Sequence, residues 1–176
     1  MKYTIEKIKQ DYNEGKNMNY TFFWKVGSSF GYLSQWWKSE FTIDNVTYIC
    51  CEQYMMAEKA RLFNDEHVLK EIMKTNNPNE MKALGRKIKN FDPEIWNKNC
   101  FEIVKRGNYA KFSQNEKLKL LLINHTNDIL VEASPLDTIW GIGLDCNDKN
   151  VKNPNLWNGT NLLGFALMEV KDDLIG

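Results

Sequence analysis

The sequence has few of the residues on which metal and redox sites depend. Its 176 residues include four cysteines and two histidines, and no two cysteines form a C-x-x-C pair. The histidines, His67 and His125, lie far apart along the chain. Because a tetrahedral zinc site takes closely spaced cysteine and histidine ligands, we expect no structural metal. We expect free thiols, in keeping with a reducing compartment.

The sequence also lacks an excess of charge of either sign and a long hydrophobic run. Lysine and arginine number 23, and aspartate and glutamate also number 23. No overall field therefore attracts nucleic acid or an anionic membrane, although a local basic pocket for phosphate remains compatible with this balance. No stretch approaches the ~20 apolar residues of a membrane span, and the first residues lack the apolar segment of a signal peptide. We expect a soluble, cytoplasmic protein without a membrane partner.

The motifs of several large enzyme classes are absent. The sequence contains no G-x-x-x-x-G-K-[ST], no G-x-G-x-x-G, no G-x-S-x-G and no H-E-x-x-H. Nucleoside triphosphate hydrolysis, hydride transfer and the common hydrolase mechanisms therefore have no support. Carboxylates, lysines and aromatic rings remain, and this inventory suits cleavage of a glycosidic bond to a base or an amine.

Hydrophobic periodicity predicts a mainly α protein with a small β component, which is an α+β class. Residues 1–20 are charged and polar and predict an N-terminal arm or a short helix. Residues 21–176 are long enough for one compact, multihelical domain. The expected helices span residues 51–64, 67–74, 79–88, 94–113, 115–125 and 161–174.

Strand signals are fewer. The Asp44-Asn45 step between β-branched and aromatic residues predicts a small hairpin over residues 41–49. Residues 128–134, DILVEAS, predict a short strand that leads into a loop.

Asp92-Pro93 starts the longest predicted helix, since proline is tolerated in a first helical turn. Its apolar residues recur at helical spacing, and those expected to face the core are Ile95, Cys100, Phe101, Val104 and Phe112. Gly107 lies in the same helix and is expected to weaken it.

The loop SPLDTIWGIG, residues 134–143, holds one carboxylate among residues that shape the backbone. Asp137 lies two residues after Pro135 and shortly before Trp140, Gly141 and Gly143. Glycine permits left-handed backbone, proline fixes its own φ, and tryptophan offers a flat apolar face. The loop therefore either holds a ligand or uses Asp137 to cap a turn, and the segment alone does not decide between them.

A second candidate is the stretch EQYMMAEKA in the first long helix. Glu52 and Lys59 are seven residues apart, which at 100° per residue returns to within about 20° of the same direction. An acid and an amine can thus share one helical face with apolar neighbours. The alternative is an ordinary surface acid and an unrelated solvated lysine.

Two weaker signals concern base and phosphate binding. Arg86 after Gly85, Lys111 and the run Gly141 to Gly143 could together hold a phosphate through cations and backbone N–H groups. The chain is also rich in aromatic rings, which either stack on bases or fill the core. These rings are Phe23, Trp24, Tyr32, Trp36, Trp37, Trp96, Trp140 and Trp157.

Several motifs, taken in order, resemble the NADAR family, which includes the YbiA-like N-glycosidases of riboflavin biosynthesis intermediates. The resemblance runs from about residue 22 to residue 170. It is carried by LSQWWKSEFTIDNVTYICCEQYMMAEKA, ALGRKIKNF, Trp96, NYAKF, LVEASPLDTIWGIGL and WNGTNLLGFALMEV.

The resemblance implies a cofactor-free hydrolase of N-ribosyl bonds. YbiA-like members cleave ribosylaminopyrimidine intermediates and release ribose 5-phosphate, whereas other members remove ADP-ribose from guanine. The expected partner is therefore a small-molecule ribosylated pyrimidine or an ADP-ribosylated guanine, and nucleic acid only if it carries ADP-ribose. A non-catalytic module that binds ADP-ribose or NAD is the competing class.

Four positions match the family's site motifs: Glu52, Trp96, Asp137 and Lys59 are the candidate catalytic residues. Because ribosyl C–N cleavage builds positive charge on the sugar, Glu52 is expected to stabilise that charge and Asp137 to hold water or ribose hydroxyls, with the reverse assignment open. Trp96 would stack on the base or exclude solvent. Lys59 would form a Schiff base or act as a cation. The candidate substrate-binding residues are Phe23, Trp24, Ser34, Arg86, Trp140, Gly141 and Asn161.

Overall fold

The computed structural model describes residues 1–176 and contains seven α-helices, two 3-10 helices and four short strands. This composition confirms the predicted α+β class. The chain divides into two compact units: unit 1 comprises residues 1–34 and 117–176, and unit 2 comprises residues 35–116. No helix combines the length and the apolar composition that a membrane span requires.

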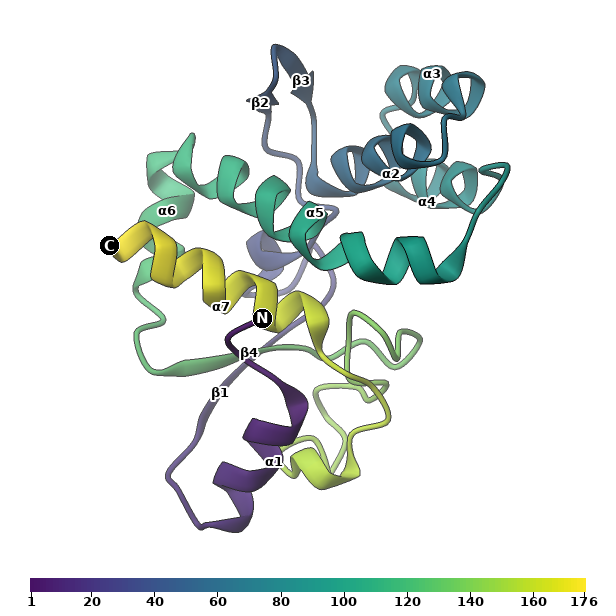
Figure 1. The fold of residues 1–176 in the computed structure, drawn as a ribbon. Coiled ribbons are helices and arrows are strands. Elements are labelled where there is room, and N and C mark those ends of the chain that lie inside the picture. The colour runs from purple at the N-terminus through teal and green to yellow at the C-terminus, as the bar shows by residue number, and fades with distance from the viewer. The chain divides into compact units, whose positions relative to one another are not determined.

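Unit 1 is built around two parallel strands from distant parts of the chain. Its elements are α1 (Ile5–Asn13), β1 (Asn19–Phe23), η1 (Gly31–Leu33), α6 (Glu116–Ile123), β4 (Asp128–Glu132), η2 (Pro154–Leu156) and α7 (Leu162–Ile175). β1 pairs with β4 in a register that places Phe23 opposite Glu132. Figure 1 shows α7 along β4, where Leu130 and Val131 are fully buried.

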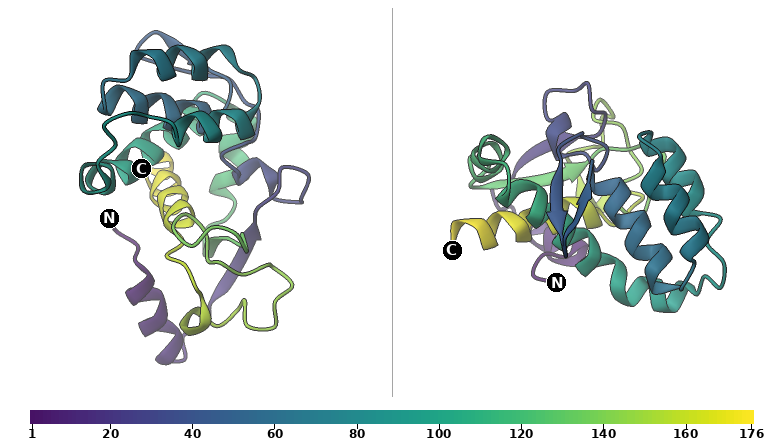
Figure 2. Two further views of the ribbon diagram at one scale, coloured as in Figure 1. Left: turned by 90° about the vertical axis from the view of Figure 1, so that its right-hand side faces the viewer. Right: turned by 90° about the horizontal axis from the view of Figure 1, so that it is seen from above.

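Unit 2 is a cluster of four helices with one hairpin. Its elements are β2 (Phe41–Ile43), β3 (Val46–Tyr48), α2 (Cys51–Leu62), α3 (Glu66–Lys74), α4 (Pro78–Gly85) and α5 (Pro93–Ser113). α2 packs against α3, α4 and α5, and Figure 2 shows these helices grouped together in blue and teal. Because α2 has partners on several sides, eight of its 12 residues are buried.

The hairpin confirms the strand prediction for this region. β2 and β3 are antiparallel, with Phe41 opposite Tyr48. Asp44 and Asn45 form the turn with φ values of 51° and 62°. Both angles lie in the left-handed region that suits a two-residue hairpin loop, and Asn and Asp tolerate this region better than most residues.

The predicted inward face of α5 is correct only in part. Cys100, Val104 and Phe112 are buried, but Phe101 is half-buried and Ile95 is 43% exposed. The prediction for Ile95 is therefore wrong. No residue of α5 before Cys100 is buried, so the first turns of this helix extend past its packed part.

Gly107 has a packing role that its helix propensity does not reveal. A Cβ atom at this position would lie 2.5 Å from Cδ1 of Tyr54, which is well inside contact distance. Gly107 therefore lets α5 approach α2 closely at the buried Tyr54 ring.

The largest boundary differences from the sequence prediction lie at β1 and at the end of α4. Residues 19–23 form β1, although only an arm or a short helix was expected up to residue 20; the helix found there is α1. α4 ends at Gly85 and not at residue 88, and Arg86 follows as its C-cap.

Candidate functional site

Glu52 lies in the first turn of α2 and is almost completely buried. Its exposed fraction is 6%, and its backbone N–H donates to the carbonyl oxygen of Gln35 at 3.0 Å. An acid in a first helical turn interacts favourably with the partial positive charge of the helix N-terminus. The structure thus places this carboxylate inside unit 2, as the apolar neighbours in EQYMMAEKA suggested.

Buried polar side chains that the sequence analysis did not single out lie at this end of α2. The Asn108 side-chain amide donates to Oε1 of Gln35 at 2.8 Å and to the carbonyl oxygen of Val104 at 2.9 Å. The thiol of Cys51 contacts Oδ1 of Asn108 at 3.6 Å. Such pairs join residues far apart in sequence, so no local pattern could have found them.

Lys111 is fully buried, contrary to the role considered for it in phosphate binding. Its exposed fraction is 0%, and burial lowers the pKa of its amine. A side chain without exposed surface cannot meet an incoming phosphate unless the structure opens.

Lys59 and Trp96 are brought together in unit 2. The Lys59 amine lies 5.3 Å from the Trp96 ring and 4.2 Å from the Phe91 ring. It also donates to the carbonyl oxygen of Gly85 at 3.0 Å. Burial and the neighbouring Arg86 lower the pKa of this amine. Phe91, which is 43% exposed, is an additional site candidate that the sequence analysis missed.

Asp137 in unit 1 organises the loop of residues 134–143. Its Oδ1 accepts the backbone N–H groups of Ile139 at 3.0 Å and Trp140 at 2.8 Å. Its own carbonyl oxygen accepts the N–H of Gly143 at 3.0 Å. The turn-capping alternative is therefore present in the structure, and any ligand-binding role of Asp137 adds to it. The side chain is half-buried.

The glycines of this loop allow a close approach of the backbone and a left-handed backbone conformation. A Cβ atom on Gly141 would lie 2.8 Å from the carbonyl oxygen of Glu132, and Gly143 has a φ of +67°. The N–H of Ile142 donates to Glu132 at 3.0 Å, and that of Gly143 donates within the loop. These two N–H groups are thus engaged, which argues against a phosphate cradle built from them.

Buried positions are common among the candidate substrate-binding residues of unit 1. Phe23 is 2% exposed and Ser34 is 8% exposed. Asn161 is fully buried, and its side-chain amide donates to Leu130 at 2.9 Å and accepts from Glu132 at 3.0 Å. Asn161 therefore fastens the start of α7 to β4.

Gly141 is also buried, whereas the other three candidates have accessible surface. Trp24 and Trp140 are half-buried, and Arg86 in unit 2 is exposed. Lys25 lies over the Trp24 ring, with its amine 4.5 Å from the ring centre.

Unit 1 also holds a polar network that the sequence analysis did not single out. Nε2 of His125 lies 2.7 Å from the Tyr32 hydroxyl, and Nδ1 lies 2.8 Å from Oδ2 of Asp128. The Thr21 hydroxyl donates to the same carboxylate at 2.8 Å. The hydrogen bond from His125 lowers the pKa of the Asp128 carboxyl. The three-residue step between His125 and Asp128 was the only local signal for this network.

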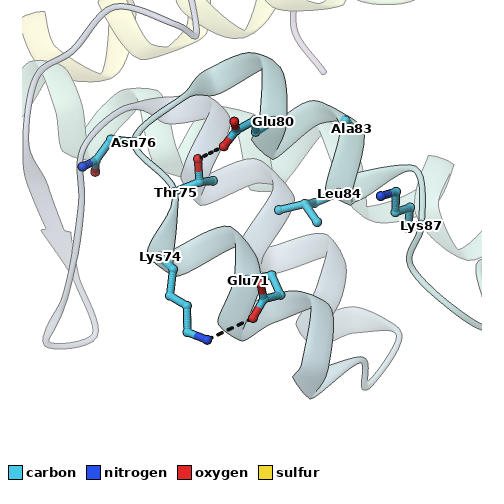
Figure 3. Close-up of a pocket in the computed structure, with 8 residues that line it drawn as sticks. All are labelled: Glu71, Lys74, Thr75, Asn76, Glu80, Ala83, Leu84 and Lys87. Carbon is cyan, nitrogen blue, oxygen red and sulfur yellow. Dashed lines mark hydrogen bonds and ion pairs between the residues drawn. The ribbon is translucent and has the colours of Figure 1, made fainter.

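Unit 2 has a surface groove between α3 and α4 with a volume of about 590 Å³ (Figure 3). Lys74 pairs with Glu71 at 3.0 Å, and Thr75 donates to Glu80. No candidate site residue lines the groove. Its lining residues are Glu71, Lys74, Thr75, Asn76, Glu80, Ala83, Leu84 and Lys87.

This chain belongs to the NADAR family: the model of the NADAR domain matches residues 22–175. The family resemblance of the sequence motifs is thereby confirmed. The fold agrees, because the NMR structure of Escherichia coli YbiA superimposes with a TM-score of 0.72 at 25% identity, covering 89% of this chain and 85% of that one.

Individual relatives carry names that bear on activity. The N-glycosidase R617 of Acanthamoeba polyphaga mimivirus is 47% identical over 126 residues, which is 72% of this chain and 74% of the viral protein. The N-glycosidase YbiA of E. coli is 26% identical over 152 residues, 86% of each chain. The chloroplastic riboflavin biosynthesis protein PYRR of Zea mays is 27% identical over 140 residues, 76% of this chain but only 21% of the maize protein.

Proposed function

We propose that this protein hydrolyses the N-ribosyl bond of phosphoribosylaminopyrimidine intermediates of riboflavin biosynthesis and releases ribose 5-phosphate. The chain is an N-glycosidase, a hydrolase that acts on N-glycosyl compounds, as its named relatives are. The observation that carries the proposal is the family match over residues 22–175 with the site motifs present. The name of the maize relative supports the riboflavin substrate.

The reaction adds water across the bond between the anomeric carbon and the exocyclic nitrogen. The water oxygen bonds to the anomeric carbon, the C–N bond breaks, and the nitrogen keeps the bond's electron pair and takes a proton. Positive charge develops on the sugar in the transition state. We assign Glu52 to the stabilisation of this charge, because a buried carboxylate interacts strongly with a cation where water is excluded.

Asp137 is assigned to binding water or ribose hydroxyls. Two backbone N–H groups hold its carboxylate in one orientation. A carboxylate that is already oriented loses little conformational freedom when it accepts a further hydrogen bond. Trp140 and Gly141 belong to the same loop and would contribute to binding through its shape.

Trp96 is assigned to the exclusion of solvent beside Lys59. The lowered pKa of Lys59 supports the Schiff base scheme, because only the neutral amine attacks an opened sugar imine. The Gly85 carbonyl and the two aromatic rings support a cation. Borohydride reduction during turnover separates these roles: a Schiff base leaves a covalent sugar adduct on Lys59, whereas a cation leaves none and turnover continues.

A parallel assay tests the proposed substrate. The purified protein and Asp137→Ala are incubated with 5-amino-6-(5-phosphoribosylamino)uracil and with ADP-ribosylated guanine, and free ribose 5-phosphate and ADP-ribose are measured. We expect ribose 5-phosphate from the first substrate with the wild type and little with the variant. Asp148→Ala is the matched control, since Asp148 is also half-buried and also accepts a backbone N–H within a turn.

Two outcomes would overturn the proposal. Release of ADP-ribose from guanine without release of ribose 5-phosphate would assign the protein to the other NADAR substrate class. Tight binding of ADP-ribose without hydrolysis of either substrate would make it a binding module.

A further inference from the structure

The loop of residues 134–143 presents two large aliphatic side chains to solvent. Leu136 is 87% exposed and Ile139 is 58% exposed, and they flank Asp137. Neither side chain contributes much to the core at this exposure. Single exposed aliphatic residues are common on proteins, but here two lie beside a candidate catalytic acid.

The backbone under these side chains is held firmly within unit 1. Thr160 donates its N–H to Thr138 at 3.1 Å and its hydroxyl to the carbonyl oxygen of Ile139 at 2.6 Å. The N–H of Leu162 reaches the same Ile139 oxygen at 3.3 Å. Together with the two bonds to Asp137 Oδ1, these contacts fix the loop, so the exposed aliphatic surface is already formed before any ligand arrives.

We propose that Leu136 and Ile139 bind the face of the heterocyclic base of the substrate and so determine specificity for the leaving group. This inference rests on the proposed function. In a phosphoribosylaminopyrimidine only the base offers a flat, weakly hydrated face, because the ribose is hydroxylated and the phosphate is charged. Two aliphatic side chains offer far less area than the roughly 800 Å² on each side that a stable protein partner needs, which favours a small ligand.

The two products of hydrolysis separate the base part of the site from the sugar part. Leu136→Ser and Ile139→Ser are assayed for KM, for kcat and for inhibition by 5,6-diaminouracil and by ribose 5-phosphate. We expect KM and the inhibition constant of 5,6-diaminouracil to rise about tenfold in each variant. The inhibition constant of ribose 5-phosphate stays within about twofold of wild type, and Leu136→Met and Ile139→Val restore the wild-type values.

The chain offers a matched control in Ile175, at the end of α7, which is 57% exposed against 58% for Ile139. Ile175→Ser should leave all four kinetic constants unchanged. Thermal unfolding of each variant checks that the exposed substitutions leave the fold intact.

Three results would overturn the inference. Unchanged KM in both serine variants would mean that the aliphatic pair does not touch the base. Equal weakening of both products would mean that the loop has been distorted. A wild type that binds 5,6-diaminouracil no better than the double variant Leu136→Ser/Ile139→Ser, measured by titration without turnover, would also exclude it.

A wild type that hydrolyses neither N-ribosyl substrate contradicts the proposed function itself, whereas the preceding results contradict only this inference.

Discussion

Glu52 and Asp137 are both assigned to the same reaction, but they differ in burial and in the structural element that carries them. Glu52 lies on a helix with buried neighbours and is 6% exposed. Asp137 lies on a loop and is half-buried, and one of its carboxylate oxygens accepts hydrogen bonds from two backbone N–H groups. Burying a carboxylate is unfavourable, whereas capping a turn is favourable. The comparison predicts that removing the charge of Glu52 affects activity alone, whereas removing the side chain of Asp137 affects both activity and stability.

Glu52→Gln should give the largest loss of kcat, and it tests the role assigned to Glu52. The amide keeps the volume of the side chain but removes its charge, so we expect kcat to fall about 1,000-fold. We expect the thermal midpoint to change little, because the lost interaction with the N-terminus of α2 and the easier burial of a neutral amide oppose each other. Steady-state kinetics and thermal unfolding measure the two quantities.

Glu169→Gln is the control for Glu52, since Glu169 in α7 is 7% exposed against 6% for Glu52 and has no role in the proposed reaction. Its kcat should equal that of the wild type. If Glu52→Gln kept kcat within about fivefold of wild type, Glu52 would be a structural acid and the comparison would fail.

Asp137→Asn and Asp137→Ala test the role assigned to Asp137 and should have a smaller effect. Both remove the charge, so we expect kcat to fall about 100-fold in each. Only the alanine variant loses the acceptor for the N–H groups of Ile139 and Trp140, so only it should lose about 1 kcal/mol of unfolding free energy in urea titrations. Equal stability of the two variants would show that the turn does not depend on this side chain.

Asp128 is a third acid for comparison, and its substitution should have the smallest effect, a change in stability that depends on pH. Its pKa in the folded protein lies below the ordinary value of 3.8, chiefly because His125 donates a hydrogen bond to it. The stabilisation is therefore complete above that ordinary value and is lost as pH falls through the folded-state pKa. Thermal midpoints of wild type and Asp128→Asn should differ at pH 7 and converge as the pH falls below 3.8. A difference that stays constant with pH would contradict this account.

Local signals in the sequence were sufficient for most helices and for the hairpin. Asp92-Pro93 marked the start of α5, and Asp44-Asn45 marked the turn between β2 and β3. β1 was missed because its first two residues, Asn19 and Tyr20, end the charged and polar segment of residues 1–20, which left too short a pattern to recognise as a strand. The exposure of Ile95 was missed because periodicity identifies a helix face but not how much of its length is packed.

The candidate site was predictable to a similar degree. Helical spacing indicated a shared face for Glu52 and Lys59. In the structure the Lys59 amine lies over the Trp96 ring, which is a second candidate residue. Helical spacing did not indicate Phe91, whose ring contacts the Lys59 amine although Phe91 lies in another part of the chain. Nor did it indicate the hydrogen bonds of the Asn161 side chain to the backbone of β4, because bonds to backbone atoms leave no sequence signature; its role in substrate binding stays a prediction.

The pairing of β1 with β4 also sets an order of events during synthesis. Unit 2 is one continuous segment, residues 35–116, and unit 1 is made from the segments before and after it. Every residue of unit 2 has therefore left the peptidyl-transferase centre before the first residue of β4 is added. β1 therefore stays without its partner strand during that whole interval, and its free edge can then pair with another molecule.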